Sequence, residues 1–301
     1  MVNLSRLSCF LWFLASATAV HADEPLRWKF QPGQRLSYGI VQEMVISGGD
    51  PAGELDNNSR QQLDVTWEIE RVDAEGTAAL RLKFDRIRTK MTLPIGGLEY
   101  DSAAKGPATG MAAINAPLYQ ALIKAPVELT ISADGRVTSV KLPDDVQAAL
   151  KRMPTSAAFG DLTKPETFQN LFMPGFPMLS PEKSPTPGYQ WPIKSTTTLP
   201  GAAGDQTVDT NYLYEGVRNV DGKSVAVIRQ TRSISFSGSQ TVQRTVKEQS
   251  TEGEILFDVA AGRLQSTILK HIVTMSVKRG DAVAEQKIEQ KVEVKPITPS
   301  P

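Results

Sequence analysis

The stretch "LDVTWEIERVDAEGTAALRLKF" at residues 63–84 decides the fold. Its first eight residues alternate apolar and polar side chains, which predicts a half-buried β-strand. The loop Asp73–Gly76, with Gly76 in the left-handed backbone region, predicts a hairpin turn. The resulting register pairs apolar side chains across the hairpin: Val65 with Phe84, Trp67 with Leu82, and Ile69 with Leu80. A slip of one residue would set Trp67 against Lys83, so the apolar pattern specifies this register.

A second hairpin is predicted at residues 126–142, "PVELTISADGRVTSVKL". Asp134-Gly135 is a typical two-residue hairpin turn. The expected pairs are Leu129 with Val140 and Val127 with Leu142 on the apolar face, and Glu128 with Lys141 on the polar face. Further strands are predicted at 206–216, 223–237, 240–251, 263–278 and 282–295, and the alternating charges at 285–293 predict a solvated face. Such two-faced strands are typical of an antiparallel sheet covered on one side.

Three short helices are predicted in the middle of the chain: "APLYQALIKA" at 116–125, "PDDVQAALKRM" at 143–153 and "KPETFQNLF" at 164–172. The first two carry proline near the expected first turn, where its missing N–H costs little. Their apolar faces comprise Leu118, Leu122 and Ile123, and Val146, Ala149, Leu150 and Met153. The proline-rich stretch 173–192 that follows predicts a linker or crossover.

These elements predict a mainly β, α+β fold. Long antiparallel hairpins form a curled sheet, and two or three short central helices cover its apolar face. We expect a single domain over residues 23–301. The similar strings "DGRVTS" at 134–139 and "AGRLQS" at 261–266 suggest an internal duplication, with related halves at 23–155 and 190–296. Unrelated hairpin turns also converge on such strings, so the sequence leaves both interpretations open.

The N-terminus predicts a secretory signal peptide over residues 1–22. Arg6 precedes the apolar run "LSCFLWFLASATAV", and small residues occupy the −3 and −1 positions, Val20 and Ala22, before Asp23. An uncleaved membrane anchor is the alternative, but the run is shorter than the roughly 20 residues that span a bilayer. Cleavage would remove Cys9, the only cysteine, and leave a periplasmic or extracellular chain without thiols or disulfides.

We expect a reporter fused to residues 1–30 to be exported from a bacterial host with a new N-terminus at Asp23. N-terminal sequencing of the exported product tests this. Ala22→Trp removes the small residue at the −1 position and should leave the fusion uncleaved. An intact Met1 on the exported product would contradict the signal peptide.

Composition and motifs argue against catalysis. Lysine plus arginine equals aspartate plus glutamate, 33 against 33, so there is no basic surplus for nucleic acid. Cysteine–histidine pairs and histidine-rich zinc sites are excluded, because His271 is the only histidine after residue 22. No phosphate loop or nucleophile elbow occurs. We therefore predict no enzyme, with no catalytic, cofactor or metal residues.

His271 lies on the same face of its predicted strand as Leu269, Val273 and Met275, which predicts a packed histidine bonded to a neighbour. A general base or a metal ligand is the alternative.

Two charged clusters carry alternative interpretations. The acidic loop contains Asp50, Glu54 and Asp56, which could bind Ca²⁺, but a solvated hairpin tip is favoured because the spacing fits no calcium-binding loop. A basic stripe runs along one predicted strand: Arg81, Lys83, Arg86, Arg88 and Lys90. An anionic glycan or phospholipid headgroup is one partner for this stripe. Cross-strand pairing with Glu68 and Glu70 is the favoured interpretation.

The stretch "RWKFQPGQRLSYGIVQEM" at 27–44 carries a resemblance through Trp28, Phe30, Gly33, Leu36 and Tyr38. This aromatic-x-Phe-x-x-Gly-x-x-Leu-x-Tyr pattern resembles the start of the mature region in a family of exported bacterial proteins of unknown function. The strings at 128–140 and 257–267 are similar to later hairpins of that family. The resemblance implies an extracytoplasmic β-rich domain, with no established activity and no catalytic residues.

Two functions are compatible with this fold. The first is a non-catalytic structural or interaction protein of the cell envelope with a filled core. The alternative is a binding module or carrier for an apolar ligand or lipid between sheet and helices, because the fold resembles lipoprotein-carrier and lipid-binding folds of bacterial envelopes. The candidate lining consists of Trp67, Leu82, Phe84, Leu118, Leu122, Leu150 and Met153. No cofactor is expected, and no partner is identified beyond such a ligand or an envelope component.

Overall fold

The computed structural model describes residues 25–50, 53–54, 56–93, 96–110, 112–153, 160–182, 184–199, 203–220, 222–239 and 241–298. The predicted signal peptide and Cys9 lie outside the described residues. The strands are β1 (Arg35–Asp50), β2 (Gly53–Glu54), β3 (Asn57–Val72), β4 (Ala78–Leu93), β5 (Gly96–Asp101), β6 (Val127–Ile131), β7 (Val137–Lys141), β8 (Gln190–Thr198), β9 (Asp205–Val220), β10 (Lys223–Ser237), β11 (Gln243–Asp258), β12 (Arg263–Arg279) and β13 (Ala282–Pro296). The helices are α1 (Ala112–Lys124), α2 (Asp144–Arg152) and α3 (Pro165–Phe172).

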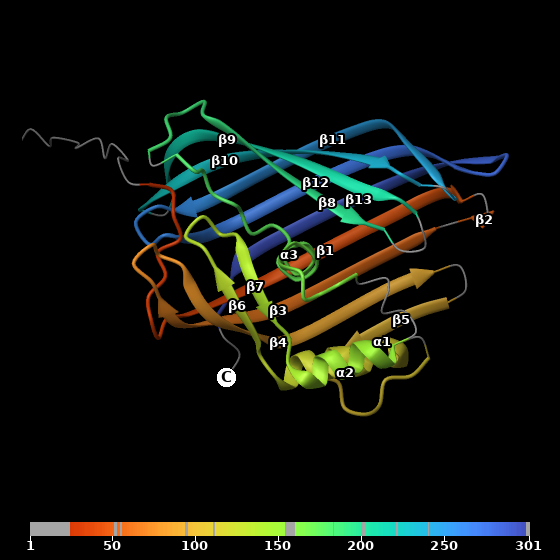
Figure 1. Cartoon of the computed structure of the whole chain (residues 1–301), viewed down its shortest axis with the longest axis horizontal. Helices are drawn as coiled ribbons and strands as arrows, with labels where there is room; N and C mark the ends of the chain where they lie inside the picture. The colour runs from red at the N-terminus through yellow and green to blue at the C-terminus, as the bar shows by residue number, and fades with distance from the viewer. Residues whose placement is uncertain are drawn as a thin grey trace, which may run out of the picture.

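The strands form one curled antiparallel sheet, which confirms the predicted fold class (Figure 1). Its order is β7-β6-β4-β3-β1-β13-β12-β11-β10-β9-β8, with β2 beside β1 and β5 beside β4. Strands from the first part of the chain therefore occupy one side and those after residue 190 the other, and the two sides meet where β1 pairs with β13. In the described residues β7 and β8 end the order, so the sheet curls without closing.

The hairpin β3–β4 has the predicted register. The observed pairs are Val65 with Phe84, Trp67 with Leu82, Ile69 with Leu80, and Glu68 with Arg81. The turn places Gly76 at φ 84°, as expected. Beyond Phe84 the register shifts by a bulge between Asp64 and Val65, so that Ile87 rather than Arg86 continues the buried face.

The hairpin β6–β7 differs from its prediction at the turn. Leu129 pairs with Val140 and Glu128 with Lys141, as predicted. A bulge between Thr130 and Ile131 then lengthens the turn beyond the two-residue form.

All five strands predicted after residue 200 are present, although β11 continues to Asp258, beyond its predicted end at residue 251. β8 lies within and beyond the stretch that was interpreted as a linker or crossover. Proline is normally absent from sheet interiors because it removes a ladder hydrogen bond. β8 is an edge strand paired with β9 alone, and Pro192 is tolerated there. The sequence rule was correct, but it did not distinguish an edge strand from a loop.

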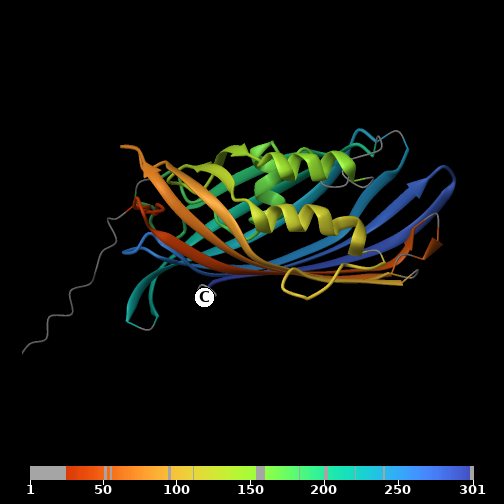
Figure 2. The ribbon, with the colours of Figure 1, turned by 90° about the horizontal axis from the view of Figure 1, so that it is seen from below.

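The three predicted helices are present, and one proline position was wrong. α1 begins at Ala112, so Pro117 lies inside the helix rather than in its first turn. In α3, Pro165 occupies the first turn. Figure 2 shows the helices on the concave face of the sheet. α1 packs on α2, β4 and β5, and α3 packs on β7. Among the described helices, none has the length and apolar character needed to cross a membrane.

The stretch that resembles the family start closes one end of the concave face. Trp28 N donates to Ala133 O at 2.8 Å and Lys29 N donates to Gly262 O at 2.9 Å. A Cβ at Gly262, whose φ is 58°, would lie 2.3 Å from the Lys29 side chain, so only glycine permits this approach. The similar strings at 134–139 and 261–266 thus both lie at turns that receive this N-terminal segment. The apolar side chains of the motif are buried: Trp28, Phe30, Leu36 and Tyr38.

Candidate ligand-binding site

The seven predicted lining residues come together in a filled core. Trp67, Leu82, Phe84, Leu118, Leu122 and Met153 are buried in one cluster, and Leu150 packs half-buried against it. None of the seven lines the cavity described next. The space between α1, α2 and the sheet is therefore packed with side chains.

A cavity of about 340 Å³ lies on the other half of the concave face. It is bounded by α3 and the segment after it on one side, and by β8, β9 and β10 on the other. The volume falls in the range of about 300–1,000 Å³ typical of small-molecule sites. Its apolar lining comprises Leu171, Met173, Pro174, Phe176, Met178, Ile193, Val208 and Ile234. Sequence reasoning missed this cavity because its wall includes β8 and the proline-rich segment, which predicted no regular structure.

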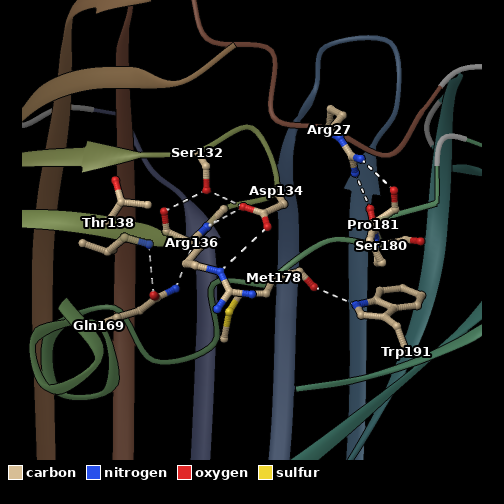
Figure 3. Close-up of polar contacts among 12 residues, drawn as sticks. Arg27, Ser132, Asp134, Arg136, Thr138, Gln169, Met178, Ser180, Pro181 and Trp191 are labelled. Atoms are coloured by element: carbon tan, nitrogen blue, oxygen red, sulfur yellow. Dashed lines mark hydrogen bonds and ion pairs between the residues drawn. The ribbon is translucent and has the colours of Figure 1, made fainter. Parts of the chain in front are cut away.

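Hydrogen bonds fix the segment that covers the cavity, residues 165–181, as Figure 3 shows. We call it the covering segment. Gln169 of α3 donates to Gly135 O at 3.1 Å and accepts from Val137 N at 3.2 Å, which ties α3 to the β6–β7 turn. Trp191 Nε1 donates to Met178 O at 3.0 Å. Arg27 donates to the carbonyl oxygens of residues 180 and 181. The covering segment is held at several points along its length, so the cavity is preformed.

The covering segment also packs closely against the sheet at Gly175. Gly175 has φ 82°, and a Cβ there would lie 2.9 Å from Val294. Thr267 Oγ1 donates to Gly175 O at 2.7 Å. Beside the covering segment, the rings of Trp191 and Tyr212 stack with centroids 5.3 Å apart. Tyr212 lines the cavity, and burial raises the pKa of its hydroxyl.

A polar row crosses the concave face beside the cavity. It runs over β9–β13 and comprises Thr210, Arg232, Thr251, His271 and Gln290, which we call the polar row. Thr251 Oγ1 donates to Arg232 O at 2.8 Å and accepts from Arg232 N at 3.2 Å, which places these strands in register. Thr210, Arg232 and Gln290 line the cavity directly.

Two buried nitrogens of the polar row have no hydrogen-bond partner among the described residues: Arg232 Nε and His271 Nε2. Buried polar atoms are nearly always hydrogen-bonded, and each exception calls for a physical explanation, of which a bound ion or water is one. His271 is only 2% exposed, so the predicted packed position is confirmed, but the predicted bond to a neighbour is not found at Nε2.

Burial, and to a smaller extent the positive charge of Arg232, lowers the pKa of His271 to about 4. Burial also lowers the pKa of Arg232 from its usual value. At neutral pH His271 is uncharged, and the positive charge of the polar row lies on Arg232.

Beyond the polar row, the concave face becomes apolar again. Val242, Val273, Met275 and Val277 form a second buried cluster. Ile234, which lines the cavity, packs half-buried against it. Ile234 therefore lies between the cavity and this buried cluster, whose four members do not line the cavity.

The side chains of the basic stripe lie on the outer face of the sheet and form ion pairs with carboxylates on neighbouring strands. Each of its five members contacts a carboxylate: Arg81 with Glu68 and Glu70, Lys83 with Glu68, Arg86 with Asp101, Arg88 with Asp64, and Lys90 with Glu99. The cross-strand interpretation of the stripe is confirmed. The charges at 285–293 likewise lie on the outer face, as predicted.

The acidic loop forms a hairpin tip. β2 pairs with the end of β1, Gly49 opposite Glu54. Asp56 is exposed. The side chains of Asp50 and Glu54 lie outside the described residues, so the calcium alternative is not tested there.

Three solved structures show similarity at low identity. A lipovitellin structure, described by its lipid–protein interactions, is 14% identical with TM-score 0.46, over 90% of this chain and 26% of that chain. A DUF1329 family protein from Desulfovibrio piger is 12% identical with TM-score 0.16, over 87% of each chain. A putative outer membrane lipoprotein-sorting protein domain from Vibrio parahaemolyticus is 11% identical with TM-score 0.17, over 88% of this chain and 87% of that chain. All three scores lie below 0.5, so none establishes a common fold.

A search of curated proteins gave no match. One protein-family model does match, and the matched segment extends from the β3–β4 turn to the turn before β12. Residues 75–262, more than half of the chain, match the family of unknown function DUF6263, and the protein belongs to that family.

Proposed function

We propose that this protein is an exported binding module that holds the apolar chain of a small amphiphile in the cavity between α3 and β8–β10. The observation that carries the proposal is the cavity of about 340 Å³. Its lining combines eight apolar side chains with ten polar ones, a composition that suits an amphiphile rather than a wholly apolar ligand. The bonds that anchor the covering segment favour a preformed site, because little order would have to be created on binding.

Export is part of the proposal and rests on the predicted signal peptide at residues 1–22. A module of this kind in the cell envelope would shield an apolar chain from water. The proposal is of binding and not of catalysis.

A structural or interaction protein of the envelope is the second candidate. The packing of the seven predicted lining residues into a filled core favours it. The two candidates differ in the role of the cavity: a binding module holds a ligand there, whereas a purely structural protein does not.

The test is to fill the cavity and measure the binding of N-phenyl-1-naphthylamine, a neutral probe that fluoresces in apolar surroundings. Val208 is half-buried and lines the cavity from β9. We expect Val208→Trp to weaken probe binding at least tenfold, because the indole occupies the volume that the probe needs.

The matched control is Ile268→Trp. Ile268 lies on β12 and is 52% exposed, so the same new side chain points into solvent. This variant should bind the probe as the wild type does. A wild-type protein that fails to bind the probe, or equal binding by Val208→Trp, would instead favour the structural candidate.

A further inference from the structure

We propose that the ligand carries an anionic headgroup, a carboxylate or a phosphate, bound by Arg232, with its single acyl chain in the cavity. This inference rests on the binding function proposed above and adds the chemical class of the ligand.

Arg232 is an inward-facing cation that has no counter-ion in the part of the chain that the structure describes. It is largely buried, lines the cavity, and has no carboxylate within ion-pair distance among the described residues. Arg229 on the same strand faces outward and pairs with Glu215 and Glu254 at 3.0 and 3.2 Å. Placing an uncompensated charge in such a site is unfavourable, and an anion at the guanidinium would offset this.

The groups beside Arg232 suit an anion. Tyr212 and Gln290 line the same cavity and offer a hydroxyl and an amide. His271 lies two strands away in the polar row, with Nε2 buried and without a partner. The described residues that line the cavity include no aspartate or glutamate that would repel an anion. A guanidinium is suited to carboxylates and phosphates, since its planar donors bind two oxygens at once.

The apolar part of the cavity lining beside Arg232 accommodates a chain. Towards α3 the lining is Met173, Phe176 and Ile193. On the far side Ile234 lines the cavity and packs against the buried cluster of Val242, Val273, Met275 and Val277. A free inorganic anion would leave this surface unused, so the arrangement favours an anion joined to a hydrocarbon chain.

The experiment compares two fluorescent probes that differ only in charge: cis-parinaric acid and its methyl ester. We expect the wild-type protein to bind the acid at least tenfold more tightly than the ester at pH 7.5, because the carboxylate pairs with the guanidinium. In Arg232→Gln the preference should disappear, with affinity for the ester retained. Arg229→Gln is the matched control on the outer face and should keep the preference. Ester binding and circular dichroism report whether each variant is folded.

The outcomes separate the two proposals. If the wild type binds neither probe, the binding function itself fails. If it binds acid and ester equally, the anionic headgroup is refuted while the binding function stands, and no variant is needed to reach that result. Inorganic phosphate distinguishes the sources of the anion. Displacement of cis-parinaric acid by equimolar phosphate would refute an acyl-chain ligand, whereas retention of the acid supports it.

Discussion

Truncation of Trp67 to alanine is expected to lower the free energy of unfolding by about 3–5 kcal/mol. The indole is 1% exposed and contacts four other aromatic rings. The nearest is Phe176, at a centroid distance of 4.8 Å. Removal of the indole leaves a void that the rigid sheet cannot fill. The loss is a large part of the roughly 5–15 kcal/mol that stabilises a typical domain. Thermal and urea unfolding of the purified protein measure it.

Trp67→Phe is the control, because it keeps a ring at the centre of the cluster. It should destabilise the protein by clearly less than the alanine variant. In folded Trp67→Phe protein, binding of N-phenyl-1-naphthylamine should be unchanged, since Trp67 does not line the cavity. A Trp67→Ala variant that melts like the wild type would contradict the filled core at this position.

The hairpins could be predicted from the sequence because their pairing is local. The alternation around Trp67 and the turn at Gly76 determine the register of β3 and β4 without help from the remainder of the chain. The positions of the charged residues on the outer face follow from the same alternation. The set of residues that meet under α1 and α2 follows as well, since they lie on these strands and helices, but the pattern left open whether they enclose a cavity.

The polar row could not be predicted, because it depends on the cumulative register of five strands. Arg232 and His271 come together through β11, and bulges shift the register twice between β11 and β12. Each bulge changes the pairing of residues between adjacent strands, and no local sequence pattern indicates its position. Parity correctly placed His271 on the packed face. It could not reveal that an unpaired arginine lies on the same face.

The stability of the protein is expected to fall by about 2 kcal/mol between pH 8 and pH 5 through His271. The pKa of this group is about 4 in the folded protein and 6.5 in an ordinary environment. Between these values the unfolded chain binds a proton that the folded protein does not. The stabilisation is therefore complete above pH 6.5 and declines as the pH falls towards 4. Urea unfolding at half-unit pH intervals measures the slope.

His271→Gln isolates this contribution, because glutamine has similar polarity and does not titrate. At pH 8 the variant should be less stable than the wild type by about 1 kcal/mol, the usual effect of a point mutation. The two stability curves should then cross near pH ~6, because only the wild type loses stability in this window. Parallel curves would show that His271 binds protons equally in both states. Arg232→Gln removes a positive charge that repels the protonated imidazole, so the pKa of His271 should rise from about 4, while burial still holds it below 6.5. The loss of stability between pH 8 and pH 5 should therefore be smaller in Arg232→Gln than in the wild type.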